Sequence, residues 1–154
     1  MLFAWVAQSD GSAGPPAVAS LERHLFEAVN GYRRDAGLPA LRYDDTLAAA
    51  ARGHSEAMAA GKTAFGHEGL TTRAEEIGTT IALASLSENI ARHSRRPEEV
   101  VDVTLRNWIA SDAHRRNLRS DKQLTGVGIA QSPRGEIYVT QIFVGLQPGG
   151  APGV

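Results

Sequence analysis

The chain has 154 residues, a formal net charge of −1 and no cysteine. This length suits a single domain with one core, and the near-zero charge gives no support for nucleic-acid binding. The absence of cysteine excludes disulfides, thiolate nucleophiles and cysteine metal ligands, and no apolar run approaches the roughly 20 residues of a membrane span.

Both ends of the chain are expected to lie outside the folded domain. Residues 1–19 combine a short apolar stretch with a segment rich in Ser, Gly, Ala and Pro. We interpret them as a flexible lead-in whose apolar part is either the trimmed end of a signal peptide or a hydrophobic arm. Residues 147–154 are rich in Gly and Pro and indicate a flexible tail. The folded domain is therefore predicted to span residues 20–146.

Two amphipathic helices are predicted in the first third of the domain. The first is expected to begin at Ser20, a good N-cap residue, and to end at Gly37 before Pro39. Its apolar residues recur at helical spacing. The second is expected to follow Asp44-Asp45 and to end at Gly61.

Residues 62–96 show no clear period and are predicted to form an irregular functional loop region, with a short strand or turn near 87–92. A third helix is expected from Pro97, whose fixed backbone angle suits a first turn. It should break at Ser111-Asp112, and a short helical turn should continue through His114.

The domain is predicted to end in a β-hairpin. Residues 126–130 lead into a turn at 132–135, and residues 137–144 return. Both faces of the return strand are apolar, which indicates a sheet covered on both sides. We therefore predict an α+β fold, a three-layer α-β-α sandwich with a small antiparallel sheet between helices. Gly126 and Gly128 should let a helix lie close against one strand.

Three of the five histidines have ordinary structural interpretations. His24 is expected at the surface, and His93 in a solvated loop edge beside Arg95 and Arg96. His54 falls on the inward face of the second helix, which favours a hydrogen-bonded core histidine over a ligand. His67, Glu88 and His114 lie in polar contexts instead, and are candidates for a shared site.

Several segments resemble the signature segments of the CAP superfamily (cysteine-rich secretory, antigen 5 and pathogenesis-related domains), in its cysteine-free bacterial branch. They occur in the family order and together cover most of residues 20–145. The segments are 30–41, Phe65-Gly66-His67, 87–91 (Ser-Glu-Asn-Ile-Ala) and 108–118, followed by Gly126-Val127-Gly128 and 138–143.

The resemblance implies a cleft that holds two histidines and two acids. By motif, His67 and His114 occupy the histidine positions and Glu88 the first acid position. The second acid is replaced by Ser111. Glu68 and Asp112 remain alternative sources of that acid, although Asp112 follows Ser111 by about 100° on a helix.

This set of residues is compatible with more than one activity. Two neutral imidazoles, His67 and His114, suit zinc or another divalent cation, and Glu88 could orient a ligand or act as a general base. The alternative is that all three residues hold the loop in place by hydrogen bonds.

The resemblance implies a secreted or cell-surface protein, which we expect to be monomeric. It favours binding of a small, lipidic or cell-wall ligand. The alternatives are a metal-dependent hydrolase acting on peptide or cell-wall material, and a structural or stress-related surface protein with an inactive cleft. The missing second acid favours binding over catalysis. Asn89 and Asn117 are expected to be structural.

Overall fold

The structure is a computed structural model that describes residues 17–149, so most of the predicted lead-in and tail lies outside the described residues. The elements follow one another as α1 (Val18–Asp35), β1 (Arg42–Tyr43), α2 (Asp45–Ala59), α3 (Leu70–Gly78), β2 (Leu83–His93), α4 (Pro97–Ala110), α5 (Asp112–Leu118), β3 (Leu124–Gln131) and β4 (Ile137–Leu146). None of the described helices combines the length and apolar character needed to cross a bilayer.

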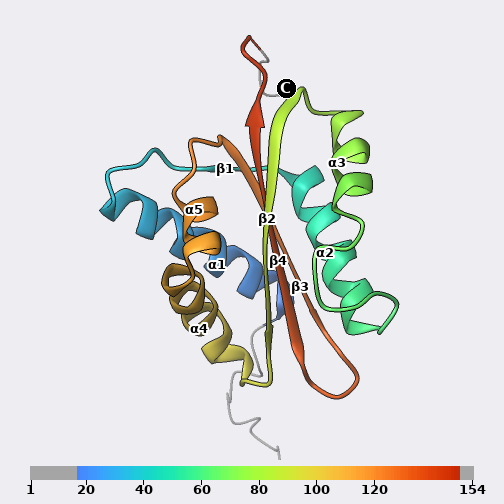
Figure 1. The fold of residues 1–154 in the computed structure, drawn as a ribbon. Coiled ribbons are helices and arrows are strands. Elements are labelled where there is room, and N and C mark those ends of the chain that lie inside the picture. The colour runs from blue at the N-terminus through green and yellow to red at the C-terminus, as the bar shows by residue number, and fades with distance from the viewer. Residues whose placement is uncertain (1–16, 150–154) are drawn as a thin grey trace, which may run out of the picture.

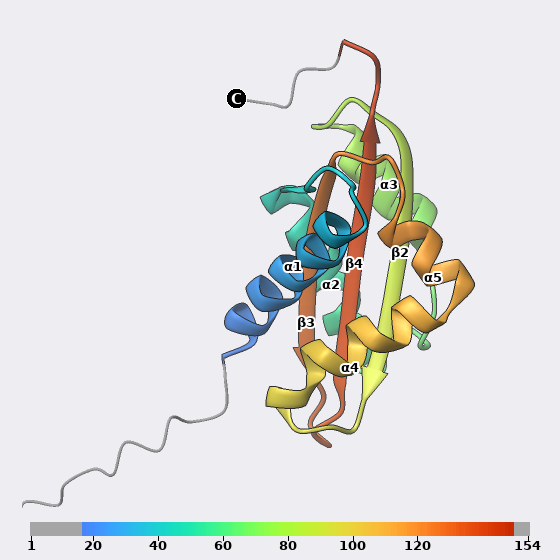
Figure 2. The ribbon, with the colours of Figure 1, turned by 90° about the vertical axis from the view of Figure 1, so that its left-hand side faces the viewer.

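The helices form two layers with a four-stranded sheet between them (Figure 1). α2 and α3 cover one face, and α1, α4 and α5 cover the other (Figures 1 and 2). The predicted three-layer sandwich is therefore confirmed. The strand order is β1-β3-β4-β2. The three long strands are antiparallel as predicted, whereas β1 adds a short parallel pair with β3.

The alternation along β4 divides the core between the two faces. Ile137, Val139 and Phe143 pack in the cluster beneath α1 and α4. Ile142 and Val144 pack on the opposite face with α2 and α3. The predicted assignment of these residues to two covered faces is confirmed. Since both faces of the central strand β4 are filled by core side chains, we look for a functional site near an edge of the sheet.

Gly126 and Gly128 bring β3 into contact with the backbone of α2. A Cβ atom on Gly126 would lie 2.1 Å from the Ala48 nitrogen, and one on Gly128 would lie 1.9 Å from the Arg52 nitrogen. The close approach predicted for these two glycines is confirmed.

A buried carboxylate binds β3 on the edge where β1 pairs with only two of its residues. β1 pairs with β3 at Leu124 and Thr125. Farther along β3, Glu22 of α1 accepts a hydrogen bond from the Ile129 backbone nitrogen at 3.0 Å. Glu22 is itself held by Arg52 of α2, through Nε at 2.9 Å and Nη2 at 2.6 Å.

Two predictions on residues 62–96 were wrong. The segment is mostly regular, because it contains α3 and the eleven-residue strand β2, which includes the strand or turn expected near residues 87–92. α3 buries Ile77 alone, so it has no apolar stripe to reveal it. His93 is buried, not solvated, and its Nε2 lies 2.7 Å from Thr104 Oγ1 of α4.

The start of the first helix also differs from the prediction. α1 begins at Val18 with Ala17 at the N-cap, so Ser20 lies in the first turn. Helix boundaries depend on terminal backbone geometry, which one good capping residue does not determine. Asp44 caps α2 by accepting from the Leu47 nitrogen at 3.0 Å.

Candidate functional site

The candidate site lies at β2, an edge strand of the sheet that has α3 on one face and α4 and α5 on the other. Glu88 is on β2, His67 precedes α3 on one face, and His114 lies in α5 on the other. Neighbouring residues on a strand point to opposite faces. Accordingly, Glu88 contacts Arg73 of α3, whereas Asn89 donates to the His114 carbonyl at 3.2 Å.

Glu88 is the centre of the hydrogen-bond network, and its side chain is fully buried. Arg73 Nε donates to Oε2 at 3.0 Å, and Nη2 donates to Oε1 at 2.9 Å and to Oε2 at 2.8 Å. A forked guanidinium–carboxylate pair of this kind is both strong and directional. Arg73 therefore balances the buried charge of Glu88 and occupies both of its oxygens.

Arg73 is the functional residue that sequence reasoning missed. It belongs to no motif in the chain, and α3 has almost no buried face. Knowledge that Glu88 is buried would have pointed to Arg73, because a buried carboxylate needs a cationic partner. Arg73 is the sole Lys or Arg between Lys62 and Arg92 in the sequence.

His67 is oriented by Glu88. Its Nδ1 lies 2.9 Å from Glu88 Oε1, while its side chain is 48% exposed. Since an ionised carboxylate can only accept, Nδ1 carries the proton of this bond. The Nε2 lone pair of the neutral ring is then left free for a metal ion or a ligand donor.

His54 supports the loop that carries His67. Its Nε2 donates to the Gly66 carbonyl at 2.7 Å, and its Nδ1 accepts from Arg73 Nη1 at 3.1 Å. Burial lowers the pKa of His54, and the positive charge of Arg73 adds to this effect. These contacts confirm the prediction of a hydrogen-bonded core histidine, which here joins α2, α3 and the Gly66-His67 segment.

His114 reaches the site from the opposite helical layer. Its ring lies 6.3 Å from the Trp108 ring, measured between centroids. Burial lowers the pKa of His114, and the nearby charge of His67, when protonated, lowers it further. Among the described residues, no hydrogen bond joins the His114 ring to His67 or Glu88. The structure thus brings His67 and Glu88 into direct contact, and His114 into electrostatic range of His67.

Neither alternative for the second acid contributes a carboxylate to this centre. Glu68 Oε2 accepts from Thr63 Oγ1 at 3.1 Å in an exposed position. Asp112 is strongly exposed and pairs with Arg115. The position that the motif gives to the second acid holds Ser111, so Glu88 is the acid that contacts His67.

Side chains from α4 and α5 fix the strand beneath the site. Asn117 donates to Asn89 Oδ1 at 2.8 Å and to the Glu88 carbonyl at 3.4 Å. Trp108 Nε1 donates to the Ile90 carbonyl at 3.0 Å. The two asparagines are therefore structural, as predicted, and they hold Glu88 and α5 in register.

The donor set for a metal ion is small. Within residues 17–149, no group of three or more His, Cys, Asp or Glu side chains is placed to hold a metal ion. Because Arg73 occupies both oxygens of Glu88, the nitrogens of His67 and His114 are the donors that remain. A divalent cation held by these two imidazoles would keep open positions for water, and Glu88 would orient His67 from outside the coordination sphere.

Comparison with known proteins supports the assignment suggested by the motifs. Residues 26–143 match the CAP family, described as the Cysteine-rich secretory protein family. The chain is 32% identical over 139 residues to the uncharacterized protein YkwD of Bacillus subtilis (strain 168), covering 87% of this chain. It spans about half of that relative's length, because the match covers 51% of it.

Solved structures share the fold. An extracellular protein of Bacillus anthracis that contains an SCP domain superposes with a TM-score of 0.68 at 25% identity, covering 86% of this chain and 45% of that one. An outer surface protein of Borrelia burgdorferi also has a TM-score of 0.68, at 18% identity and with 87% and 98% of the two chains covered. Together with the ordered motifs and the sandwich fold, the match over residues 26–143 shows that this chain belongs to the CAP family.

Proposed function

We propose that this chain is an extracellular binding domain that takes a small, lipidic or cell-wall ligand, and that His67 and His114 form the contact point of its cleft. The extracellular setting is supported by the relatives, which include an extracellular protein and an outer surface protein. The observation that carries binding over catalysis is the ion pair between Glu88 and Arg73.

This ion pair argues against hydrolysis by a carboxylate base. A general base needs an accessible lone pair within reach of the attacking water. Glu88 is fully buried, Arg73 donates to both of its oxygens, and His67 takes a further position on Oε1. Glu68 and Asp112 accept hydrogen bonds elsewhere, and within residues 17–149 Glu88 is the carboxylate that contacts His67.

The same arrangement suits His67 as a ligand-binding group. Glu88 fixes the proton on Nδ1, so Nε2 faces outward as an acceptor. The lowered pKa of His114 keeps its ring neutral near pH 7, which leaves a second nitrogen lone pair available. Zinc or another divalent cation held by these two nitrogens would supply a positive charge that attracts an anionic or carbonyl oxygen of the ligand. Two protein donors imply modest affinity.

Zinc titration by calorimetry tests the metal-binding part of this proposal. We expect one zinc ion per chain in the unmodified protein, and a loss of roughly tenfold or more in affinity for His67→Ala and for His114→Ala. His24→Ala is the matched control, because His24 is exposed on α1. The zinc affinity of this variant should equal that of the unmodified protein.

Measurements of substrate cleavage and of ligand binding distinguish a hydrolase from a binding domain. Native mass spectrometry with fatty acids and cell-wall fragments should detect a bound ligand, while casein and peptidoglycan should remain uncut with zinc present. Zinc-dependent cleavage that disappears in both histidine variants would overturn the binding proposal in favour of a hydrolase. A protein that binds neither zinc nor any of these ligands would leave the cleft with a structural role and would also overturn it.

A further inference from the structure

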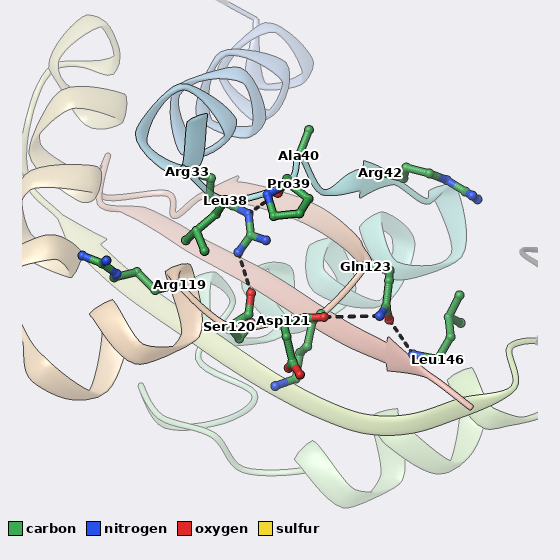
Figure 3. Close-up of a pocket in the computed structure, with 11 residues that line it drawn as sticks. Arg33, Leu38, Pro39, Ala40, Arg42, Arg119, Ser120, Asp121, Gln123 and Leu146 are labelled. Atoms are coloured by element: carbon green, nitrogen blue, oxygen red, sulfur yellow. Dashed lines mark hydrogen bonds between the residues drawn. The ribbon is translucent and has the colours of Figure 1, made fainter. Parts of the chain in front are cut away.

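A cavity lies away from the His67 site, and none of its lining residues belongs to that site. It has a volume of about 470 Å³ and lies between the C-terminal end of α1, the segment 38–42 and the segment 119–123 that follows α5. Figure 3 shows Arg33 at its centre. We call this cavity the Arg33 pocket.

The Arg33 side chain is buried, and one nitrogen of its guanidinium has no hydrogen-bond partner among the described residues. Its Nε donates to the Pro39 carbonyl at 2.9 Å, and Nη1 donates to the carbonyls of Leu118 at 2.9 Å and Ser120 at 2.8 Å. Nη2 makes no hydrogen bond to any residue in the described part of the chain. In Figure 3 it points into the space between Pro39 and Gln123.

The charge of Arg33 lacks an acidic partner. The residue is 1% exposed, and no carboxylate of residues 17–149 lies within ion-pair distance of it. Burial lowers the pKa of Arg33, which reflects the cost of removing its charge from water. Buried charges in proteins are ordinarily paired, so an open donor on an unpaired guanidinium facing a cavity is a position for an anion.

The rest of the pocket indicates the kind of anion. Lys122 adds positive charge, Asp121 is the single acid in the lining, and Leu38, Pro39 and Leu146 provide apolar walls. Arg42 and Arg119 lie at the two ends, with their guanidinium groups directed outward (Figure 3).

The Ser120 hydroxyl is also buried without a hydrogen-bond partner among the described residues. Because this hydroxyl has almost no exposed surface, Arg33 Nη2 is the donor that faces the cavity.

We propose that the Arg33 pocket binds the carboxylate of a small organic acid, with Arg33 Nη2 donating to one oxygen and the apolar walls receiving the carbon chain. A carboxylate with a carbon chain fits better than inorganic phosphate, because Leu38, Pro39 and Leu146 provide apolar walls and the guanidinium groups of Arg42 and Arg119 are directed outward. This site is independent of the proposed function, since its lining shares no residue with the histidine cleft.

Titration of the full chain with isovalerate, followed by backbone amide chemical shifts, tests this proposal. We expect saturable shifts at residues 38–42 and 119–123. The neutral isostere isovaleramide should leave them unchanged, and inorganic phosphate should bind more weakly than isovalerate. Equal binding of the amide, tighter binding of phosphate, or shifts centred on His67 would each overturn the proposal.

Variants that change the charge of the lining should shift the affinity for isovalerate in opposite directions. Lys122→Glu should weaken isovalerate binding by about two- to fivefold, and Asp121→Asn should strengthen it by a similar factor. Lys62→Glu is the matched control, because Lys62 and Lys122 are the two lysines of the chain and both changes alter net charge equally. Lys62→Glu should leave binding unchanged. Equal effects of the two lysine variants, or no effect of Asp121→Asn, would refute the site.

Discussion

Substitution of Gly128 by alanine should be among the most damaging single-methyl changes in this protein. The added Cβ would lie 1.9 Å from the Arg52 nitrogen and 2.3 Å from the Ala51 carbonyl carbon. Comfortable contact requires about 3.5 Å, so α2 would have to move roughly 1.5 Å away from β3. Overpacking ordinarily costs about 1–3 kcal/mol, and here the clashing atoms are helix backbone that cannot change rotamer. We expect a loss of about 3 kcal/mol or more.

Gly53→Ala provides the matched control. Gly53 lies on α2, the helix that Gly128 contacts, and a Cβ atom added to Gly53 would meet nothing within 4 Å. Alanine is the better helix former, so this variant should gain about 0.5–1 kcal/mol. Urea denaturation followed by far-UV circular dichroism measures both free energies of unfolding. A Gly128→Ala variant that loses less than about 1 kcal/mol would refute the claim that α2 cannot yield at this contact.

Three further predictions concern buried polar groups. Arg73→Met should cost about 3–5 kcal/mol in urea denaturation, because it leaves the buried charge of Glu88 without its guanidinium partner. Adding Glu88→Leu should recover much of the loss, and a double variant no more stable than the single one would contradict this. Burial lowers the pKa of His93, so its contribution is full above its unfolded pKa of about 6.5 and is lost as the pH falls below that value. His93→Gln should therefore flatten the decline in unfolding free energy between about pH 7 and pH 5, by up to about 1.4 kcal/mol per pH unit, and curves of equal slope would argue against it. Glu22→Ala should cost about 1–3 kcal/mol and speed hydrogen exchange of the Ile129 amide, whereas exposed Glu27→Ala should change neither.

The parts of the fold that sequence predicted are those with a strong apolar period. α1, α2 and α4 each bury a stripe, and β4 alternates between two covered faces. Gly126 and Gly128 were informative because glycine within a strand marks close backbone approach. These features depend on local spacing, which a single sequence contains.

The parts that escaped prediction depend on long-range partners. β2 is an edge strand, and polar residues at 85 and 87–89 interrupt any apolar alternation. Arg73 is recognisable as functional only once Glu88 is known to be buried beside it. His93 follows an arginine and stands close to two more in the sequence, yet Thr104 of α4 accommodates it in the interior. Each of these environments is created by a contact between distant segments.

Side chains that bind backbone groups at the edges of the sheet affect how readily another strand could add there. Unpaired strand edges are templates on which another chain can add, and aggregation often starts there. Along β3, Glu22 already takes the Ile129 amide. Along β2, Asn117 and Trp108 already take the carbonyls of Glu88 and Ile90. An incoming strand would have to displace these side chains before it could form a continuous ladder at these positions, so the contacts that hold Glu88 in place also oppose strand addition at this edge.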